Sequence, residues 1–78
     1  MRARRLNSST IDRVVFDDEA ETLHVSFRHS GRSYTYTGVP RAIYDALVRA
    51  QSAGRYFNDC IRGHFACRTD RRRYPVEG

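Results

Sequence analysis

Two short runs in which apolar and polar residues alternate constrain the fold of this chain more than any other feature. Residues 23–28 and residues 33–37 each alternate with a period of two, and Ser30-Gly31 lies between them. Such alternation is typical of a β-strand with one buried face, and Ser-Gly favours a hairpin turn. We therefore expect an antiparallel hairpin at the centre of the fold.

The flanking residues add a strand before this hairpin and a helix after it. Residues 10–16 are rich in β-branched side chains and predict a further strand. Pro40 suits the first turn of a helix, and residues 41–50 carry apolar side chains at spacings of three and four. The side chains expected on this apolar face are Ile43, Ala46, Leu47 and Ala50.

A second helix is expected over residues 53–63. Ser52 is a suitable N-cap, and Phe57 and Ile61 would face the sheet. A chain of 78 residues has room for one thin core. The sequence thus predicts an α+β fold of order β-β-β-α-α, in which a three-stranded antiparallel sheet is followed by two helices packed on one face.

The turn length decides which side chains share a face of the sheet. A two-residue turn would place Phe27 opposite Tyr34 and Val25 opposite Tyr36, all on the apolar face. We interpret Tyr34 and Tyr36 as core residues with their hydroxyls at the rim. Stacking of the two rings on nucleic-acid bases stays open as an alternative, because a three-residue turn would reverse the faces.

The other face of the sheet is predicted to be polar and to face solvent or a ligand. Its members by parity are Arg13, Val15, His24, Ser26, Arg28, Ser33, Thr35 and Thr37. Ile11 would also fall on this face, and a bulge between Ile11 and Val14 would return it to the core.

Positive charge gathers towards the two ends of the sequence. All 14 basic residues are arginine, against 9 acidic residues, and the net charge is +5. Residues 14–61 are nearly neutral. We expect a basic N-terminal arm over residues 1–8 that is mobile at its start, a domain over residues 9–66, and an Arg-rich C-terminal tail over residues 67–78. Such arms are typical of partners of nucleic acid, although they also serve solubility.

An ordered set of short motifs extends over about residues 8–65. In chain order the motifs are Ser8-Ser9, Ile11, Phe16-Asp17, Leu23, Val25, Phe27, Gly31, Tyr34-Thr35-Tyr36, Val39-Pro40, Tyr44, Leu47, Ala50, Ser52, Gly54, Tyr56-Phe57-Asn58, Ile61-Arg62 and Phe65. The set resembles the KTSC family, a domain found at the C-terminus of some lysyl-tRNA synthetases and as stand-alone bacterial and phage proteins. Phe16 and Phe65 depart from it, since the family often has Tyr there.

The resemblance implies a stand-alone single-domain member of this family, and RNA binding is the usual suggestion for its function. The family-motif residues singled out here are Tyr34, Tyr36, Asn58 and Arg62. Two readings of Asn58 stay open: it completes an anion-binding stripe with Arg55 and Arg62, or it satisfies backbone groups in the loops at Gly38 or Gly54.

We therefore expect a sequence-tolerant nucleic-acid-binding module, with RNA as partner, that uses Arg-rich arms and the polar sheet face. Arginine suits this role because its guanidinium is permanently charged and forks onto phosphate. The expected contact residues are Arg4, Arg5, Arg13, Arg28, Arg62, Arg71, Arg72 and Arg73. The alternative is a protein-interaction adaptor, with a phage origin in view, that binds no nucleic acid.

Several function classes have little support in the sequence. Cys60, His64 and Cys67 form a C-x₃-H-x₂-C pattern, but a closed zinc site needs four ligands, so we expect no metal and no cofactor. Cys60 paired with His64 lacks an orienting carboxylate, so we expect no enzyme activity. Few cysteines, no signal segment and no apolar run of transmembrane length predict a cytoplasmic protein without a membrane partner.

Overall fold

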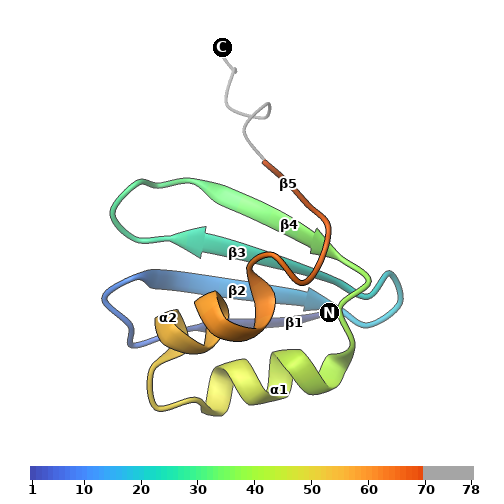
Figure 1. Cartoon of the computed structure of the whole chain (residues 1–78), viewed down its shortest axis with the longest axis horizontal. Coiled ribbons are helices and arrows are strands. Elements are labelled where there is room, and N and C mark those ends of the chain that lie inside the picture. The colour runs from blue at the N-terminus through green and yellow to red at the C-terminus, as the bar shows by residue number, and fades with distance from the viewer. Residues whose placement is uncertain (70–78) are drawn as a thin grey trace.

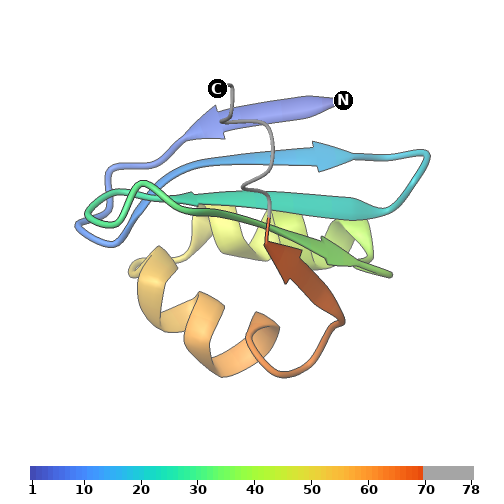
Figure 2. The ribbon, with the colours of Figure 1, turned by 90° about the horizontal axis from the view of Figure 1, so that it is seen from above.

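A five-stranded antiparallel sheet, covered on one face by two helical segments, forms the fold (Figures 1 and 2). The computed structural model describes residues 1–69. The strands lie in the order β1-β2-β3-β4-β5. Their bounds are β1 Arg2–Arg5, β2 Ile11–Asp17, β3 Thr22–Phe27, β4 Ser33–Thr37 and β5 Cys67–Thr69. The predicted α+β class, antiparallel sheet and two helices are confirmed, whereas the prediction of three strands is wrong.

The first additional strand is β1, where the sequence predicted a mobile arm. β1 pairs antiparallel with β2, and the backbone N–H of Leu6 donates to the carbonyl of Asp12 (3.0 Å). Leu6 anchors the strand in the core with 8% of its surface exposed. Residues 2–5 are all exposed. Because this edge strand has no apolar face, its sequence does not show the alternation of apolar and polar residues by which a strand is predicted.

The second additional strand, β5, occupies the start of the expected C-terminal tail. It pairs with β4, and the N–H of Thr37 donates to the carbonyl of Ala66 (2.9 Å) just before the strand. Three residues are too short a run to predict a strand from alternation. Arg71, Arg72 and Arg73 lie outside the described residues.

The central hairpin has the predicted faces but a register displaced by two residues. Tyr34 lies opposite Val25 and Tyr36 opposite Leu23, because the N–H of Phe27 bonds to the carbonyl of Arg32 (2.9 Å) and closes a longer loop. A shift of two residues preserves the face on which each side chain lies. Tyr36 is therefore in the core with 4% of its surface exposed, and Tyr34 is half-buried against it.

The core lies between the sheet and the helices. The predicted bulge is confirmed between Ile11 and Arg13, and Ile11 is fully buried. The other buried apolar residues are Leu6, Val14, Phe16, Leu23, Val25, Tyr36, Val39, Tyr44, Leu47, Ala53, Phe57 and Ile61.

The first helix, α1 (Arg41–Arg49), buries Leu47, as predicted, but its second buried residue is Tyr44, which was not predicted. Tyr44 and Leu47 are buried, whereas Ile43, Ala46 and Ala50 are only half-buried. The ring of Tyr44 stacks on Phe16 at a centroid distance of 5.4 Å. A tyrosine ring buries more apolar surface than an alanine side chain, so it turns this face of the helix towards the sheet.

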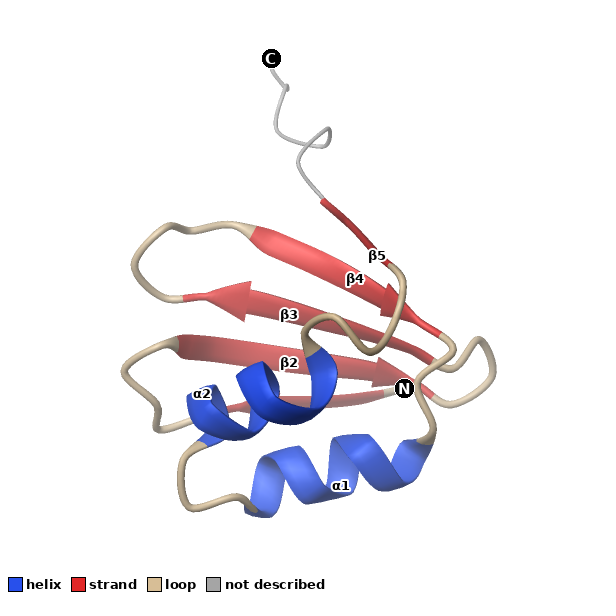
Figure 3. Ribbon diagram, in the orientation of Figure 1, coloured by secondary structure: helices blue, strands red, loops and turns tan. Residues whose placement is uncertain are grey.

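The second helix consists of α2 (Ala53–Tyr56) and a π-helical turn, η1 (Phe57–Ile61), which are drawn as one continuous helix in Figure 3. Ser52 is its N-cap, as predicted: the hydroxyl accepts a hydrogen bond from the N–H of Arg55 (3.4 Å). Phe57 and Ile61 are buried, as predicted. The wider turn ends the helix at Ile61, where the N–H of Arg62 bonds to the carbonyl of Phe57 (2.9 Å).

Candidate functional site

The two ends of the sheet carry opposite charges. At one end, a single turn joins β2 to β3, and we call this region the acidic end. Its carboxylates are Asp17, Asp18, Glu19 and Glu21. At the other end, the loops over residues 6–10 and 28–32 meet, since the N–H of Arg28 bonds to the carbonyl of Thr10 (2.9 Å; Figure 1). We call this region, with the adjacent strand residues, the basic end; its arginines are Arg5, Arg13, Arg28 and Arg32.

Arg28 holds the two loops of the basic end together. Its guanidinium donates to the carbonyls of Ser8 (2.8 Å) and Leu6 (3.0 Å) and lies 3.4 Å from a carboxylate oxygen of Asp12. The Nε, Nη1 and Nη2 atoms of the Arg28 guanidinium therefore all have partners within the protein, although the sequence predicted that this side chain contacts a ligand. In the folded chain Arg28 is therefore a positioning residue, and the same contacts neutralise Asp12.

Arg5 and Arg13 form a like-charged pair on the open face of the sheet. They are direct partners across β1 and β2, so their side chains lie on the same face. No ion pair within residues 1–69 involves either guanidinium. Like charges opposite each other on neighbouring strands are destabilising, by about 0.2–1 kcal/mol. The pair is therefore an uncompensated cluster of positive charge on the open face.

The rest of the open face is less accessible than the sequence predicted. Thr35 is 1% exposed, and its hydroxyl lies 2.8 Å from Nδ1 of the half-buried His24. Because β5 pairs along β4, Thr35 lies in the interior of the sheet and not at the predicted edge. Arg5 and Arg13 are both exposed on this face.

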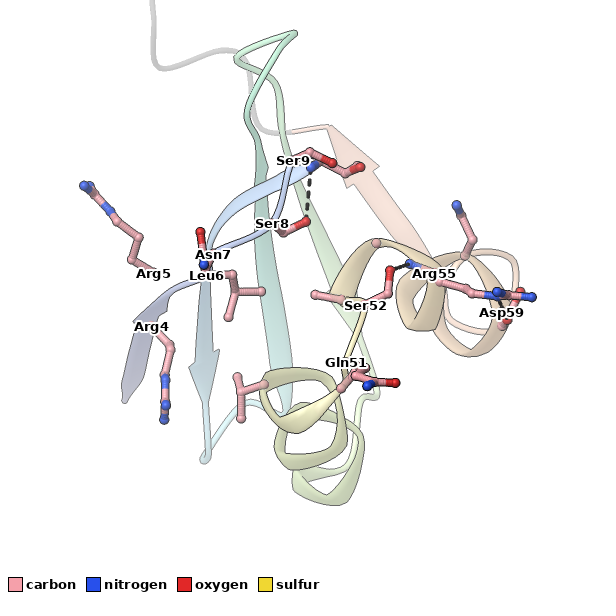
Figure 4. A pocket seen from close by; sticks show the side chains of 16 residues that line it. Arg4, Arg5, Leu6, Asn7, Ser8, Ser9, Gln51, Ser52, Arg55 and Asp59 are labelled. Carbon is pink, nitrogen blue, oxygen red and sulfur yellow. Dashed lines mark hydrogen bonds and ion pairs between the residues drawn. The ribbon is translucent and has the colours of Figure 1, made fainter.

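A polar cleft of about 900 Å³ separates the loop over residues 6–10 from the start of α2 (Figure 4). The hydroxyl of Ser8 accepts from the N–H groups of Thr10 (3.1 Å) and Ile11 (3.2 Å), so its acceptor is used in holding the loop. A Cβ on Gly54 would lie 3.1 Å from the Thr10 hydroxyl, so glycine permits this close approach. The Ser8 hydrogen bonds therefore order the loop itself, and the close approach of Thr10 to Gly54 places the loop against the helix.

Arg4 and Arg5 leave β1 towards opposite sides of the sheet (Figure 4). Arg4 lies opposite the buried Val14, on the side of the helices, and lines the polar cleft. Arg5 lies opposite Arg13 on the open face. Both residues nevertheless border the polar cleft, so their side chains differ in direction but lie near the same depression.

The four family-motif residues meet in a second depression, which we call the aromatic groove. Its volume is about 760 Å³, within the range of small-ligand sites. Residues that line it are Thr10, Phe27, His29, Ser30, Arg32, Tyr34, Tyr36, Phe57, Asn58 and Arg62. They include two arginines and no carboxylate. The groove is thus apolar at its floor and positively charged at its rim.

Four aromatic rings build the floor of the groove. Phe27 packs edge-on against Tyr34 and Phe57, with centroid distances of 5.6 Å and 5.3 Å. Tyr36 packs edge-on against Phe57 at 5.5 Å. Edge-to-face packing locks the rings in place, because the positive edge of one ring meets the negative face of the next. The floor is accordingly rigid.

The surroundings of the groove change the pKa of Tyr36. Burial, followed by the charge and hydrogen bonding of the Cys67 thiol, raises the pKa of the Tyr36 hydroxyl to about 12. The Arg62 guanidinium acts in the opposite direction, because it stabilises the phenolate. Arg62 is therefore close enough to the floor for its charge to be felt there.

The structure brings some of the predicted site residues together and separates others. Tyr34, Tyr36, Asn58 and Arg62 share the groove, and Arg5 is beside Arg13, whereas Arg4 and Arg28 belong to neither group. Burial of Tyr36 argues against a flat stacking platform made of both rings.

Asn58 and Arg32 were incompletely understood from the sequence. Asn58 is exposed and borders both the groove and the polar cleft, and its side chain makes no hydrogen bond within residues 1–69 that would tie it to the Gly38 or Gly54 loops. Arg32 and His29 were missed at the groove. The sequence did offer one sign of this loop, which is Gly31. Its φ of 70° is a conformation that glycine adopts readily, and its neighbours Ser30 and Arg32 both line the groove.

The cysteines, the candidate metal ligands and the helix lengths can be described for residues 1–69. Cys60 is half-buried and Cys67 is exposed, and both are free thiols. Within residues 1–69, no three side chains of His, Cys, Asp or Glu gather in a way that could hold a metal ion. Nor is any helix in that range long and apolar enough to cross a membrane.

Comparison with known proteins connects this architecture to a family. A model of the KTSC domain matches residues 7–65. A protein of Stutzerimonas stutzeri described as uncharacterized is 37% identical over 62 residues, or 80% of this chain and 86% of the relative. A protein of Tsukamurella paurometabola is 32% identical over 60 residues, or 77% of this chain and 88% of the relative.

A solved structure agrees with the whole arrangement. The crystal structure of a KTSC domain protein from Yersinia pestis matches with a TM-score of 0.84 and 33% identity, covering 90% of this chain and 97% of that one. The family model spans most of the fold, from the loop at the basic end to beyond the second helix, and the relatives and the solved structure each cover more than three quarters of the chain. The chain therefore belongs to the KTSC domain family.

Proposed function

We propose that this chain is a sequence-tolerant nucleic-acid-binding module, with single-stranded RNA as its ligand, and that the basic end of the sheet binds the phosphate backbone. The observation that carries the proposal is the pair Arg5 and Arg13, two cross-strand arginines with no carboxylate partner within residues 1–69. RNA is the expected nucleic acid because the family resemblance points to it.

The physical argument is one of charge left without compensation. Two guanidinium groups side by side repel each other, and a phosphate between them replaces this repulsion with two charge-assisted hydrogen-bonded contacts. A protein carboxylate could do the same, but the nearest one in sequence, Asp12, is paired with Arg28. Binding of an anion is thus favoured at this position by the arrangement of the strands.

This proposal relocates the interface that was expected from the sequence. Arg5 is part of a strand rather than of a mobile arm, and Leu6 beside it is buried. Contacts from a folded strand lose less conformational entropy on binding than contacts from a disordered segment. Removing the first residues of the chain would also remove an edge strand, so substitution is the appropriate test.

The test compares two double variants that change the net charge equally. Arg5→Gln/Arg13→Gln removes the pair at the basic end, and Arg2→Gln/Arg41→Gln removes two arginines that are each paired with an aspartate elsewhere. Fluorescence anisotropy with labelled single-stranded RNA would give the dissociation constant at several salt concentrations. For three to five phosphate contacts, the logarithmic salt slope of the wild type should be about −2 to −3.5.

We expect the basic-end variant to bind at least about tenfold more weakly and its salt slope to become shallower by about 1.4, while the control changes little. Circular dichroism would confirm that both variants are folded. Equal losses in the two variants would show that net charge alone attracts the RNA. If the wild type does not bind at about 50 mM salt and about 10 µM protein, the proposal is wrong, and the protein-interaction adaptor becomes the better hypothesis.

A further inference from the structure

The aromatic groove is a well-formed depression that takes no part in the proposed binding of the RNA phosphate backbone by Arg5 and Arg13. It lies on the helix side of the sheet, next to the loop that carries Arg28, whereas Arg5 and Arg13 are on the open face. We propose that the groove binds one nucleotide within an RNA strand: its base stacks on one of the perpendicular rings of Phe27 and Tyr34 and meets the edge of the other, and its two flanking phosphates are held at Arg32 and Arg62. This inference rests on the proposed function and adds the recognition of a base to it.

The floor of the groove suits a base. Phe27 and Tyr34 are each half-buried and line the groove, so part of each ring is left accessible beside the fully packed Phe57. Aromatic side chains bind bases of any sequence, because every base offers a π-face. The edge-to-face packing of these rings orders them in advance, so little side-chain entropy is lost when a base enters.

The positions of the two arginines favour a nucleotide inside a strand over a free nucleoside monophosphate. Arg32 immediately precedes β4, and Arg62 acts on Tyr36, near the other end of that strand. With a rise of about 3.3 Å per residue, the backbone from Arg32 to Tyr36 covers roughly 13 Å along the groove. A nucleotide in a strand has a phosphate on both sides of its sugar and can engage both arginines, whereas a 5′-monophosphate can engage only one.

Polar side chains at the rim match the remaining groups of a nucleotide. The Asn58 amide is exposed at the groove, has no partner within residues 1–69, and can both donate and accept. A group that donates and accepts can pair with the edge of any base, which agrees with sequence tolerance. Ser30 and Thr10 add hydroxyls that could bond a ribose 2′-OH.

An acidic peptide is the main rival occupant, since it too would be attracted to two arginines. It would leave the aromatic floor without a specific partner, because carboxylates are the only groups it is certain to offer. The lining of the groove contains no carboxylate, which suits both ligands, but the aromatic floor offers a specific partner only to a nucleotide base.

The direct experiment follows the aromatic and Arg side-chain NMR signals of the wild type during titration with two small probes. The probes are uridine 3′,5′-bisphosphate and uridine 5′-monophosphate. We expect shifts at Phe27, Tyr34 and Arg62, and an affinity for the bisphosphate at least about fivefold higher, because it engages a second arginine. No shift at the two rings with either probe, or equal affinity for both, would overturn the inference.

Variants then connect the groove to RNA. Arg62→Gln should weaken binding of single-stranded RNA about three- to tenfold and make the salt slope shallower by about 0.7, whereas the matched Arg41→Gln should do neither. Tyr34→Leu keeps an apolar floor but removes the ring, and we expect it to weaken RNA binding while leaving the salt slope unchanged. A thermal melt of each variant separates loss of binding from loss of folding.

The outcomes distinguish the two proposals. If wild-type protein binds RNA and depends on Arg5 and Arg13, but Arg62→Gln and Tyr34→Leu bind as the wild type does, the groove is not used and the proposed function stands. If an acidic peptide of similar length shifts the rings and competes with the bisphosphate at lower concentration, the groove is a protein-binding site and this inference fails.

Discussion

The acidic and basic ends of the sheet are both made of short connections between strands, yet they use their charges differently. At the acidic end, a carboxylate oxygen of Asp17 accepts hydrogen bonds from the N–H groups of Glu19 (3.0 Å) and Ala20 (3.3 Å). Asp18 is ion-paired with Arg2 at 3.2 Å. Among the four arginines of the basic end, only Arg28 has a side chain that is hydrogen-bonded or ion-paired within residues 1–69.

This difference between the two ends shows which charged side chains stabilise the fold. Carboxylates are natural acceptors for the free N–H groups of a tight turn, so an acidic turn can satisfy itself. Guanidinium groups need acceptors, and the basic end offers one set, which Arg28 takes. The remaining arginines there are left with solvent or an external anion. Within residues 1–69, the two ends therefore differ: charges at the acidic end serve the turn, whereas Arg5, Arg13 and Arg32 at the basic end have no ion-pair partner.

The largest expected effect is a difference in stability between substitutions of two arginines, Arg28 and Arg2, that are each ion-paired with an aspartate. Arg28→Ala should lower the free energy of unfolding by about 1–2 kcal/mol, because the carbonyls of Leu6 and Ser8 lose a charged donor. Arg2→Ala should cost at most about 0.5 kcal/mol, because it breaks only an exposed pair. Urea denaturation of both variants measures the difference, and equal losses would contradict the contrast between the ends.

A second prediction concerns alkaline pH and the groove. The hydroxyl of Tyr36 has a pKa of about 12 in the folded protein and about 10 when unfolded. Because the folded state binds this proton more tightly, the stabilising contribution is complete below about pH 10 and is lost as the pH rises towards 12. Thermal melts across this window should fall less steeply for Tyr36→Phe than for the wild type.

Arg62 provides a check on the same group. Since its guanidinium favours the phenolate, Arg62→Gln should raise the pKa of Tyr36 further, and Arg41→Gln should leave it unchanged. Ultraviolet titration of the tyrosines would measure the shift. An unchanged or lowered pKa in Arg62→Gln would mean that the Arg62 side chain does not lie over the floor of the groove.

A third prediction contrasts the backbone at the two ends. Glu21 at the acidic end has a φ of 54°, and Gly31 at the basic end has a φ of 70°. Left-handed backbone costs a residue with a Cβ about 1–2 kcal/mol, so Gly31→Ala should destabilise by about 1 kcal/mol. Glu21→Gly should stabilise by up to about 1 kcal/mol, after the added entropy of the unfolded chain is subtracted. Melting temperatures that shift in the same direction in both variants would refute this contrast.

The smallest expected effect compares two aspartates in RNA binding. Asp12→Asn removes a negative charge from the basic end and releases Arg28 from its ion pair, so the affinity for single-stranded RNA should rise about twofold. Asp18→Asn removes the same charge from the acidic end and should leave the affinity unchanged. A similar gain in both variants would show that the RNA responds to net charge without preferring either end.

Local patterns were sufficient to predict the middle of the fold. The faces of Tyr34 and Tyr36 were predicted correctly although the register was wrong by two residues, because an even displacement preserves the alternation. The Ser52 cap and the burial of Phe57 and Ile61 follow from spacing within the helix. Each of these features depends on residues that are close in sequence.

The features that were missed depend on distant contacts. β1 has no apolar face, and only its pairing with β2 reveals it as a strand. The acceptors of Arg28 are backbone carbonyls 20 and 22 residues away, which no side-chain pattern encodes. The family resemblance singled out Tyr34, Tyr36, Asn58 and Arg62 but gave no sign that they line one groove, because packing of the second helix on the sheet brings them together.

The position of β1 at the edge of the sheet has a consequence for how copies of this chain meet. An edge strand offers unpaired N–H and C=O groups on which a second sheet can grow, and that is a route to aggregation. Three of the four residues in β1 are arginine, and all four are exposed. Two such edges brought together would place like charges in register, so β1 protects the sheet from adding strands of its own kind.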